Sequence, residues 1–275
     1  MFQNSSSWDN TATDYDSASK DITFHYASKS FDLSGAKEEI QKEKNLKILD
    51  IGCGTGDLGI AIAQFSKNIK SDLKIYSTDF SKGMIDRATE KSKTFSQIEC
   101  LTMDGQKLEF KDEEVDFTFS MFAFFFFPNR KKCLDEMYRV LKPKGKVVLS
   151  IWTKNHFGEF LFATIKRCNI QMEKPSYVPV KDKETLISEM TEAKFQNIET
   201  FEAENLTTYN SEEIDVIIKG LMSNPMYTSI VSKMNSEELK NFIETLKDEI
   251  LKNYTTEDGK TIQFVTKALI GIGNK

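Results

Sequence analysis

A glycine-rich turn is the part of this sequence best suited to bind a ligand. The mostly apolar run 46–51 contains Asp50 and leads directly into Gly52, Gly54 and Gly56, which alternate over five residues. Small and apolar residues follow the turn, a pattern typical of a helix packed closely on a sheet. Glycine adopts positive φ and lets a ligand approach the main chain. This strand–turn–helix unit is therefore predicted to bind a ligand rather than only to reverse the chain.

Further acidic residues follow the next predicted strands. We expect strands at 46–51, 73–78, 97–102, 115–121 and 145–152. Four of them end at an acid or a loop: Asp50, Asp79, Asp104 and the 120–122 segment. Strands that alternate with helical patterns predict a doubly wound, mostly parallel sheet with right-handed crossovers. Ligands bind beyond the carboxyl ends of the strands in such α/β sheets, so these four positions are predicted to form one site.

The second half of the chain has a different pattern. Strands near 197–207 and 261–272 are predicted to pair antiparallel at one edge of the sheet, which brings the number of strands to seven. Residues 211–255 are predicted to be a helical insertion, and its clearest amphipathic helix begins at Ser236. We expect these helices to lie over the site as a cap.

We interpret residues 1–275 as one domain with three parts. Residues 1–45 would form an N-terminal helical flap over the strand ends, or alternatively helices packed on the outside of the domain. Residues 46–152 would form the ligand-binding core, and residues 153–275 the substrate-side half that contains the helical insertion.

Composition argues against several classes of protein. The net charge is −5 and the basic residues are scattered, so nucleic acid is not an expected partner. Four widely spaced cysteines and two histidines suggest neither a disulfide framework nor a metal site. No secretory leader is apparent, and the near-apolar run 115–127 is too short to span a membrane. A cytoplasmic protein is expected, and the sequence does not indicate an oligomeric state.

The spacing of the glycines favours a nucleoside ligand without phosphates. The dinucleotide fingerprint needs a sixth-position glycine where this chain has Asp57, whose carboxylate would repel a pyrophosphate. Asp79 is placed to accept hydrogen bonds from both ribose hydroxyls. Asp104 is placed to receive an exocyclic adenine amine, and Met84 or Phe80 would pack on the purine. Together these residues predict an adenosine-containing ligand.

Residues 46–152 resemble the class I S-adenosylmethionine-dependent methyltransferases, especially the small-molecule group that includes quinone-biosynthesis C-methyltransferases. The segments that carry the resemblance are ILDIGCGTG at 48–56, DFSKGM at 79–84, MDG at 103–105 and EMYRVLKPKG at 136–145. Lys144 departs from the pattern, since the family usually has glycine there. The resemblance implies a Rossmann-like methyltransferase fold with S-adenosylmethionine as the cofactor.

The resemblance also implies roles for individual residues. The implied cofactor-binding residues are Tyr15, Asp50, Gly52, Gly54, Gly56, Asp79, Phe80, Met84, Asp104, Gly105, Ser120 and Met121. Asp50 and the glycines would hold the methionyl end, Asp79 the ribose and Asp104 the adenine edge. Trp8-Asp9 and Tyr15-Asp16 match the aromatic–Asp pairs that open many members, which implies that Tyr15 closes over the cofactor.

The predicted reaction is methyl transfer by in-line displacement to a small, partly apolar acceptor. The phenylalanine-rich segment 122–127 and the helical insertion favour such an acceptor over a polymer. A general base is needed only when the acceptor must lose a proton, and His156 is the candidate. Two alternatives stay open: a catalytically silent S-adenosylmethionine-binding partner of another methyltransferase, and a nicotinamide-dependent oxidoreductase. Asp57 and the glycine spacing argue against the oxidoreductase.

Overall fold

The computed structural model describes residues 8–9, 12–42, 45–69, 72–171, 180 and 182–275. Its described strands are β1 Lys47–Ile51, β2 Lys74–Asp79, β3 Ile98–Thr102, β4 Val115–Met121, β5 Leu141–Lys154, β6 Gln196–Asn210 and β7 Thr261–Asn274. They form one seven-stranded sheet in the order β3-β2-β1-β4-β5-β7-β6. Strands β1 to β5 pair in parallel, whereas β7 pairs antiparallel with both β5 and β6. The predicted fold class, with its antiparallel edge, is confirmed.

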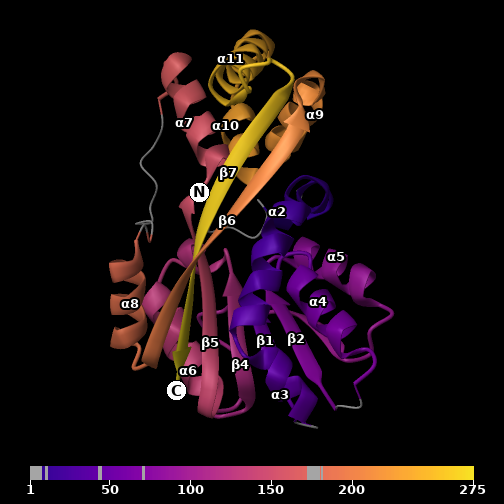
Figure 1. Cartoon of the computed structure of the whole chain (residues 1–275), viewed down its shortest axis with the longest axis vertical. Helices are drawn as coiled ribbons and strands as arrows, with labels where there is room; N and C mark the ends of the chain where they lie inside the picture. Colours follow the sequence, from indigo (N-terminus) through magenta and orange to yellow (C-terminus); the bar gives the residue numbers. More distant parts are fainter. Residues whose placement is uncertain (1–7, 10–11, 43–44, 70–71, 172–179, 181) are drawn as a thin grey trace.

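Helices cover both faces of this sheet (Figure 1). The helices in the described part of the chain are α2 Ala12–Leu33, α3 Ala36–Lys42, α4 Asp57–Ser66, α5 Lys82–Ser92, α6 Arg130–Val140, α7 His156–Arg167, α8 Lys183–Glu192, α9 Ile214–Met222, α10 Pro225–Val231 and α11 Ser236–Tyr254. One core lies between the sheet and α2, α3 and α4, and a second lies between the sheet and α6 and α8. None of the described helices combines the length and the apolar character that a bilayer span needs.

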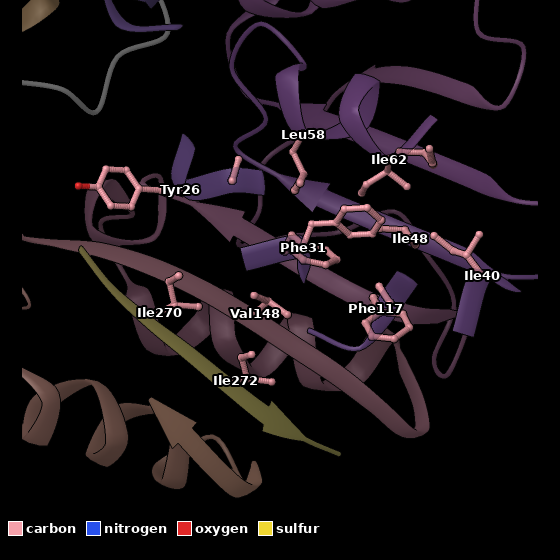
Figure 2. Close-up of a cluster of buried hydrophobic side chains, with 14 of the residues drawn as sticks. Tyr26, Phe31, Ile40, Ile48, Leu58, Ile62, Phe117, Val148, Ile270 and Ile272 are labelled. Carbon is pink, nitrogen blue, oxygen red and sulfur yellow. The ribbon is translucent and has the colours of Figure 1, made fainter. Parts of the chain in front are cut away.

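Strand β1 lies near the centre of the sheet and contributes to both cores. Ile48 faces α2–α4, whereas Leu49 and Ile51 face α6 and α8. This alternation follows from the two-residue period of a strand, and it explains why the run before the glycine turn is almost wholly apolar. Figure 2 shows Ile48 near Phe31 of α2, with Leu58 and Ile62 of α4 beside them. The buried strand therefore fixes where the glycine turn begins.

The N-terminal segment forms a 22-residue helix, α2. Its second half packs into the sheet-facing core through Ile22, Tyr26 and Phe31. The Tyr26 hydroxyl donates to the carbonyl oxygen of Thr266 on β7 at 2.7 Å, although 240 residues separate the two. This hydrogen bond thus fixes α2 to β7, the strand next to the edge strand β6.

The helical insertion extends away from the sheet on the long ends of β6 and β7 (Figure 1). Helices α9, α10 and α11 pack with α7 around a third apolar cluster that includes Phe160, Tyr227 and Phe242. Helix α9 also contacts α2. Helix α7 was absent from the sequence-based prediction, and it gives the insertion a partner other than the ligand site.

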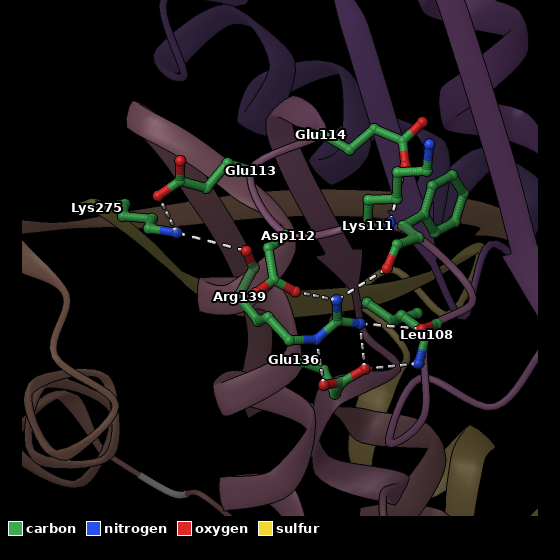
Figure 3. A network of polar contacts seen from close by, with 9 residues as sticks. Leu108, Lys111, Asp112, Glu113, Glu114, Glu136, Arg139 and Lys275 are labelled. Atoms are coloured by element: carbon green, nitrogen blue, oxygen red, sulfur yellow. Dashed lines mark hydrogen bonds and ion pairs between the residues drawn. The ribbon is translucent and has the colours of Figure 1, made fainter.

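An ion-pair network in the last turn of α6 holds the loop that follows β3. Arg139 donates to both carboxylate oxygens of Glu136 at 2.7 and 2.8 Å and to the carbonyl oxygens of Leu108 and Phe110. Figure 3 shows this guanidinium surrounded by its acceptors, with Asp112 as a further partner. The 136–145 motif is therefore a structural device that ties the loop after Asp104 to the sheet.

Lys144 has the left-handed backbone conformation, with φ 69°. An L-residue pays a steric cost there that glycine avoids. The preference for glycine at this turn, expected from the resemblance, thus has a backbone explanation.

Candidate functional site

Two neighbouring cavities lie at the carboxyl ends of β1, β2 and β4. The larger has a volume of about 240 Å³, and it is lined by Trp8, Gly52, Gly54, Asp79, Phe80, Met84, Asp104, Gln106, Met121, Phe122, Ala123, Phe126, Phe127 and Pro128. The smaller has a volume of about 60 Å³, and it is lined by Thr23, Ala27, Asp50, Gly52, Cys53, Gly54, Thr55, Asp57, Leu58 and Met121. Gly52, Gly54 and Met121 belong to both. The glycine turn therefore separates two parts of one elongated site.

The glycine turn requires glycine at its first position. Gly52 has φ 70°, and a Cβ atom there would lie 2.3 Å from the Cβ of Ala123. Its N–H donates to the carbonyl oxygen of Thr78 at 2.8 Å, which fixes the turn to β2. A larger residue would strain the backbone and displace the loop that follows β4. The turn thus brings the ends of three strands close together around the cavities.

Asp50 presents a buried oxygen without a partner. The residue is 1% exposed, and its Oδ1 has no hydrogen-bond partner among the described residues. Burial, with smaller contributions from Asp79 and Asp57, raises the pKa of Asp50 to about 8. A buried carboxylate with an unused acceptor is costly unless a partner of opposite charge is supplied. The small cavity beside Asp50 therefore fits a cationic group of a ligand.

The raised pKa of Asp50 predicts how the stability of the ligand-free protein changes with pH. The folded chain keeps the proton up to about pH 8, whereas the unfolded chain loses it near 3.8. Between these values the folded state binds more protons, so the free energy of unfolding falls as pH rises. In Asp50→Asn the fall should be less steep by up to about 1.4 kcal/mol per pH unit. Denaturant unfolding between about pH 5 and pH 7 measures this difference, and parallel pH dependences would contradict it.

Asp79 connects the glycine turn to the start of α5. Its Oδ2 accepts from the N–H of Gly54 at 3.0 Å, and its Oδ1 accepts from the N–H of Ser81 at 2.9 Å. Burial raises the pKa of Asp79 to about 6, against the lowering effect of these two amides. Phe80 and Met84 lie on the same wall of the larger cavity. The carboxylate is held rigidly and still lines the cavity, where further donors can reach it.

The structure brings most of the predicted residues together. Lining the larger cavity are Gly52, Gly54, Asp79, Phe80, Met84, Asp104 and Met121, and lining the smaller is Asp50. Asp104 is exposed, and its Oδ1 accepts from the N–H of Gln106 at 2.9 Å. Gly105 lies behind the wall, since a Cβ there would come within 2.8 Å of the Phe127 ring.

Two other predicted residues, Gly56 and Ser120, are not among the described residues that line these two cavities. Gly56 is the N-cap residue before α4 and lies against Ala88, and Ser120 is fully buried in β4. Helix α2 contains Tyr15, but its side chain lies outside the described residues. A role for these three in direct cofactor contact stays a prediction.

His156 lies away from both cavities. It is 5% exposed, its Nδ1 is 2.5 Å from Glu159 Oε2, and its ring packs among Phe160, Tyr254 and Phe264. Strand β5 continues four residues beyond Ser150, the residue opposite the end of β4. This extension, roughly 13 Å of strand, carries His156 into the apolar cluster of the helical insertion. The placement does not support His156 as a general base.

The helical insertion also contributes nothing to the walls of these cavities. None of the described residues in 211–255 lines either one. The expected position of the insertion over the site is therefore not seen in the cavity lining. Its connection to the site runs through α2, which α9 contacts and which supplies Thr23 and Ala27 to the smaller cavity.

Several lining residues were not predicted individually. On the larger cavity these are Trp8, Gln106, Phe122, Ala123, Phe126, Phe127 and Pro128. The run of phenylalanines at 122–127 was a usable signal, because apolar residues directly after a strand end face the ligand region. Thr23 and Ala27 had no comparable signal, since they come from a helix far away in the sequence.

Asp57 also differs from its predicted environment. It was expected to present a free carboxylate at the start of its helix. In the structure its Oδ1 is 2.7 Å from Lys91 Nζ, which also donates to Thr55 Oγ1. This ion pair partly neutralises Asp57, so the argument against a phosphate ligand is weaker than the sequence suggested.

Comparison with known proteins shows that the part of the chain that carries this site is similar to a known family of domains. Residues 49–149 match the family model described as a methyltransferase domain. In solved structures the fold is similar to that of the YcgJ protein from Bacillus subtilis, with a TM-score of 0.59 and 18% identity over 90% of this chain and 98% of that one. A putative methyltransferase from Bacillus halodurans has a TM-score of 0.53 and 19% identity over 88% and 97% of the two chains.

Relatives with higher sequence identity match about half of this chain. A demethylmenaquinone methyltransferase from Staphylococcus carnosus is 33% identical over 139 residues, which are 50% of this chain and 56% of the relative. A ubiquinone/menaquinone biosynthesis C-methyltransferase from Campylobacter jejuni is 33% identical over 160 residues, 55% of this chain and 64% of the relative. The match thus spans about half the length of these curated relatives.

Proposed function

Residues 49–149 are a class I S-adenosylmethionine-dependent methyltransferase domain, and from this premise we propose that the protein methylates a small, partly apolar acceptor. The observation that carries the proposal is Asp50 Oδ1, which has no partner in the described part of the chain and lies beside a small cavity at the glycine turn. S-adenosylmethionine has two positive groups at its methionyl end, an ammonium and a sulfonium. A buried carboxylate next to glycine backbone complements such a group.

We assign the cofactor's parts to the two cavities. Asp50, Gly52 and Gly54 would hold the methionyl end in the smaller cavity. In the larger one, Asp79 would accept hydrogen bonds from the ribose hydroxyls, with Phe80 and Met84 packed on the adenosine. Asp104 would take the adenine edge, and Met121 would lie where the two cavities meet. The assignment is supported by the lining of the cavities and by the position of each acid at its strand end.

Methyl transfer depends mainly on aligning the acceptor atom with the methyl group. When bound, S-adenosylmethionine supplies a methyl group on a sulfonium sulfur, and the acceptor displaces it in line. Orientation alone supplies up to ~7–11 kcal/mol toward such a step. The aromatic residues Phe122, Phe126 and Phe127 line the larger cavity, where they would shield a bound cofactor from water and restrict where an acceptor can lie. Among its described lining residues Asp79 and Asp104 are the ionisable ones, so we propose an acceptor that needs no histidine base.

The acceptor is proposed to be a small ring compound with an apolar part. The aromatic wall favours a flat, apolar molecule. Two of the relatives are named for demethylmenaquinone methylation and for ubiquinone and menaquinone biosynthesis, which supports the same class of acceptor. We leave the atom that is methylated unassigned.

Incubation of the purified protein with methyl-labelled S-adenosylmethionine and a metabolite extract tests the proposal. We expect label in small molecules that partition into organic solvent, and much less label at the same cofactor concentration when Asp79→Ala replaces the wild type. Label found only in protein or RNA would contradict the acceptor class. Cofactor binding without label in any fraction would contradict the enzymatic proposal itself.

A further inference from the structure

The N-terminal Trp8-Asp9 pair makes a specific contact with the start of α5. Asp9 Oδ1 accepts from Ser81 Oγ at 2.6 Å and from the N–H of Gly83 at 2.9 Å. The second of these is one of the free amides at a helix N-terminus, where a carboxylate is favoured by the helix dipole. The Asp9 side chain is thus held by two donors, one of them a helix amide.

The glycine at position 83 is independent evidence for this contact, because a side chain there would prevent it. A Cβ atom at Gly83 would lie 2.4 Å from the carbonyl oxygen of Asp9 and 2.6 Å from its Cα. The main chain of Asp9 therefore rests directly on Gly83. Gly83 has no left-handed φ, so the helix itself would be more stable with alanine. The contact with Asp9 supplies a reason for glycine at this position.

The same contact places Trp8 on the larger cavity. The Trp8 ring packs edge-on against Phe126 with ring centroids 5.4 Å apart, and both residues line the cavity. Ser81 connects this arrangement to the site, because its hydroxyl donates to Asp9 while its N–H donates to Asp79. A shift of Asp9 would therefore move an aromatic wall of the cavity without altering Asp79 itself.

We propose that Asp9, seated on Ser81 and Gly83, is a positioning residue that holds Trp8 over the cofactor cavity and slows cofactor release. We call this contact between Asp9 and the start of α5 the clasp. The proposal rests on the proposed function, since it assigns the retained ligand as S-adenosylmethionine or its product. The clasp acts on the exchange of cofactor rather than on methyl transfer.

The dissociation rate of S-adenosylhomocysteine, measured by stopped-flow displacement, tests the clasp. Gly83→Ala and Asp9→Ala should each raise this rate about tenfold, which corresponds to the loss of a charge-assisted hydrogen bond. The double variant should be no faster than either single one, because both changes break the same contact. Asp9→Asn keeps an acceptor oxygen and should restore part of the slow release.

The matched control is Gly158→Ala in α7. In the described part of the structure, a Cβ there would meet nothing closer than the Phe162 ring at 3.8 Å, so the dissociation rate should stay at the wild-type value. Wild-type dissociation rates in both Gly83→Ala and Asp9→Ala would overturn the proposal.

Acrylamide quenching of Trp8 fluorescence provides a readout that needs no ligand. The chain has two tryptophans, so a Trp152→Phe background leaves Trp8 as the single reporter. Gly83→Ala should increase quenching in the ligand-free protein, while Gly158→Ala should not. Equal quenching in all three proteins would overturn the clasp. Failure of wild-type protein to bind S-adenosylhomocysteine would instead contradict the proposed function, and quenching would then decide on the clasp alone.

Discussion

Replacing Asp79 by alanine should weaken S-adenosylhomocysteine binding by about 100-fold, the loss expected for two hydrogen bonds to a carboxylate. Asp79 lines the larger cavity and also accepts from the N–H groups of Gly54 and Ser81. Alanine removes the proposed ribose acceptor and leaves two amides at the turn without their partner. Isothermal titration calorimetry measures the change in affinity.

Two further variants show whether the effect belongs to the site. Asp79→Asn keeps one acceptor oxygen and should bind with intermediate affinity. Asp86→Ala removes an acid from the same crossover helix, where Asp86 pairs with Lys82 on the surface. It should bind like the wild type. Equal affinities for Asp79→Ala and Asp86→Ala would contradict the assignment of Asp79 to the ribose.

Replacing Gly52 by alanine should destabilise the protein by about 2–5 kcal/mol, through a left-handed backbone and an overpacked contact. Gly52 has φ 70°, and its new Cβ would lie 2.3 Å from the Cβ of Ala123. The turn and the loop after β4 must then move apart, which also distorts both cavities. The free energy of unfolding in denaturant measures the first effect, and loss of S-adenosylhomocysteine binding measures the second.

Gly259 provides the control for the backbone contribution. It has φ 73°, and a Cβ there would have no neighbour within 4 Å among the residues that the structure describes. Gly259→Ala should therefore cost only the left-handed penalty, about 1–2 kcal/mol. The excess in Gly52→Ala is the steric contribution of Ala123. Equal losses for the two variants would contradict the close approach between the turn and Ala123.

The alternation of strands and helices in the first half of the chain was predictable because each crossover carries its own local signal. Strand β1 is buried on both faces and is apolar almost throughout, and Ser81 caps α5 by accepting from the N–H of Met84. Such features depend on neighbours in the sequence. Helix α2 offered no comparable signal, since Ile22, Tyr26 and Phe31 pack against partners that are far away in the sequence. Its length and its packing against the sheet therefore became visible only in the structure.

The acids of the site were predictable for a related reason. Parallel strands end at a common edge, so Asp50, Asp79 and Asp104 had to lie near one another once the sheet was assigned. The remaining walls depend on distant segments. Ala27 reaches the smaller cavity from α2, and Trp8 reaches the larger one through the Asp9 contact. Sequence spacing does not encode these approaches.

The position of His156 depends on the length of β5, which is two residues longer at its end than the sequence predicted. The sequence placed it shortly after a strand expected to end at Trp152. The strand continues to Lys154, and Asn155 then caps α7 by accepting from the N–H of Phe157. The added residues carry the imidazole past the edge where ligands bind. Chain position alone could not distinguish a residue at that edge from one beyond it.

The most direct test of the account is a calorimetric titration of the wild-type protein with S-adenosylhomocysteine, with NAD titrated in parallel. We predict saturable binding of one S-adenosylhomocysteine per chain and no measurable binding of NAD. The binding of S-adenosylhomocysteine is predicted from Asp50, a buried carboxylate without a partner among the described residues, and from the acid at the ribose position. NAD would instead place its pyrophosphate at the glycine turn beside that carboxylate, where like charges repel. Absence of S-adenosylhomocysteine binding, or tighter binding of NAD, would contradict the assignment of the cavities to S-adenosylmethionine.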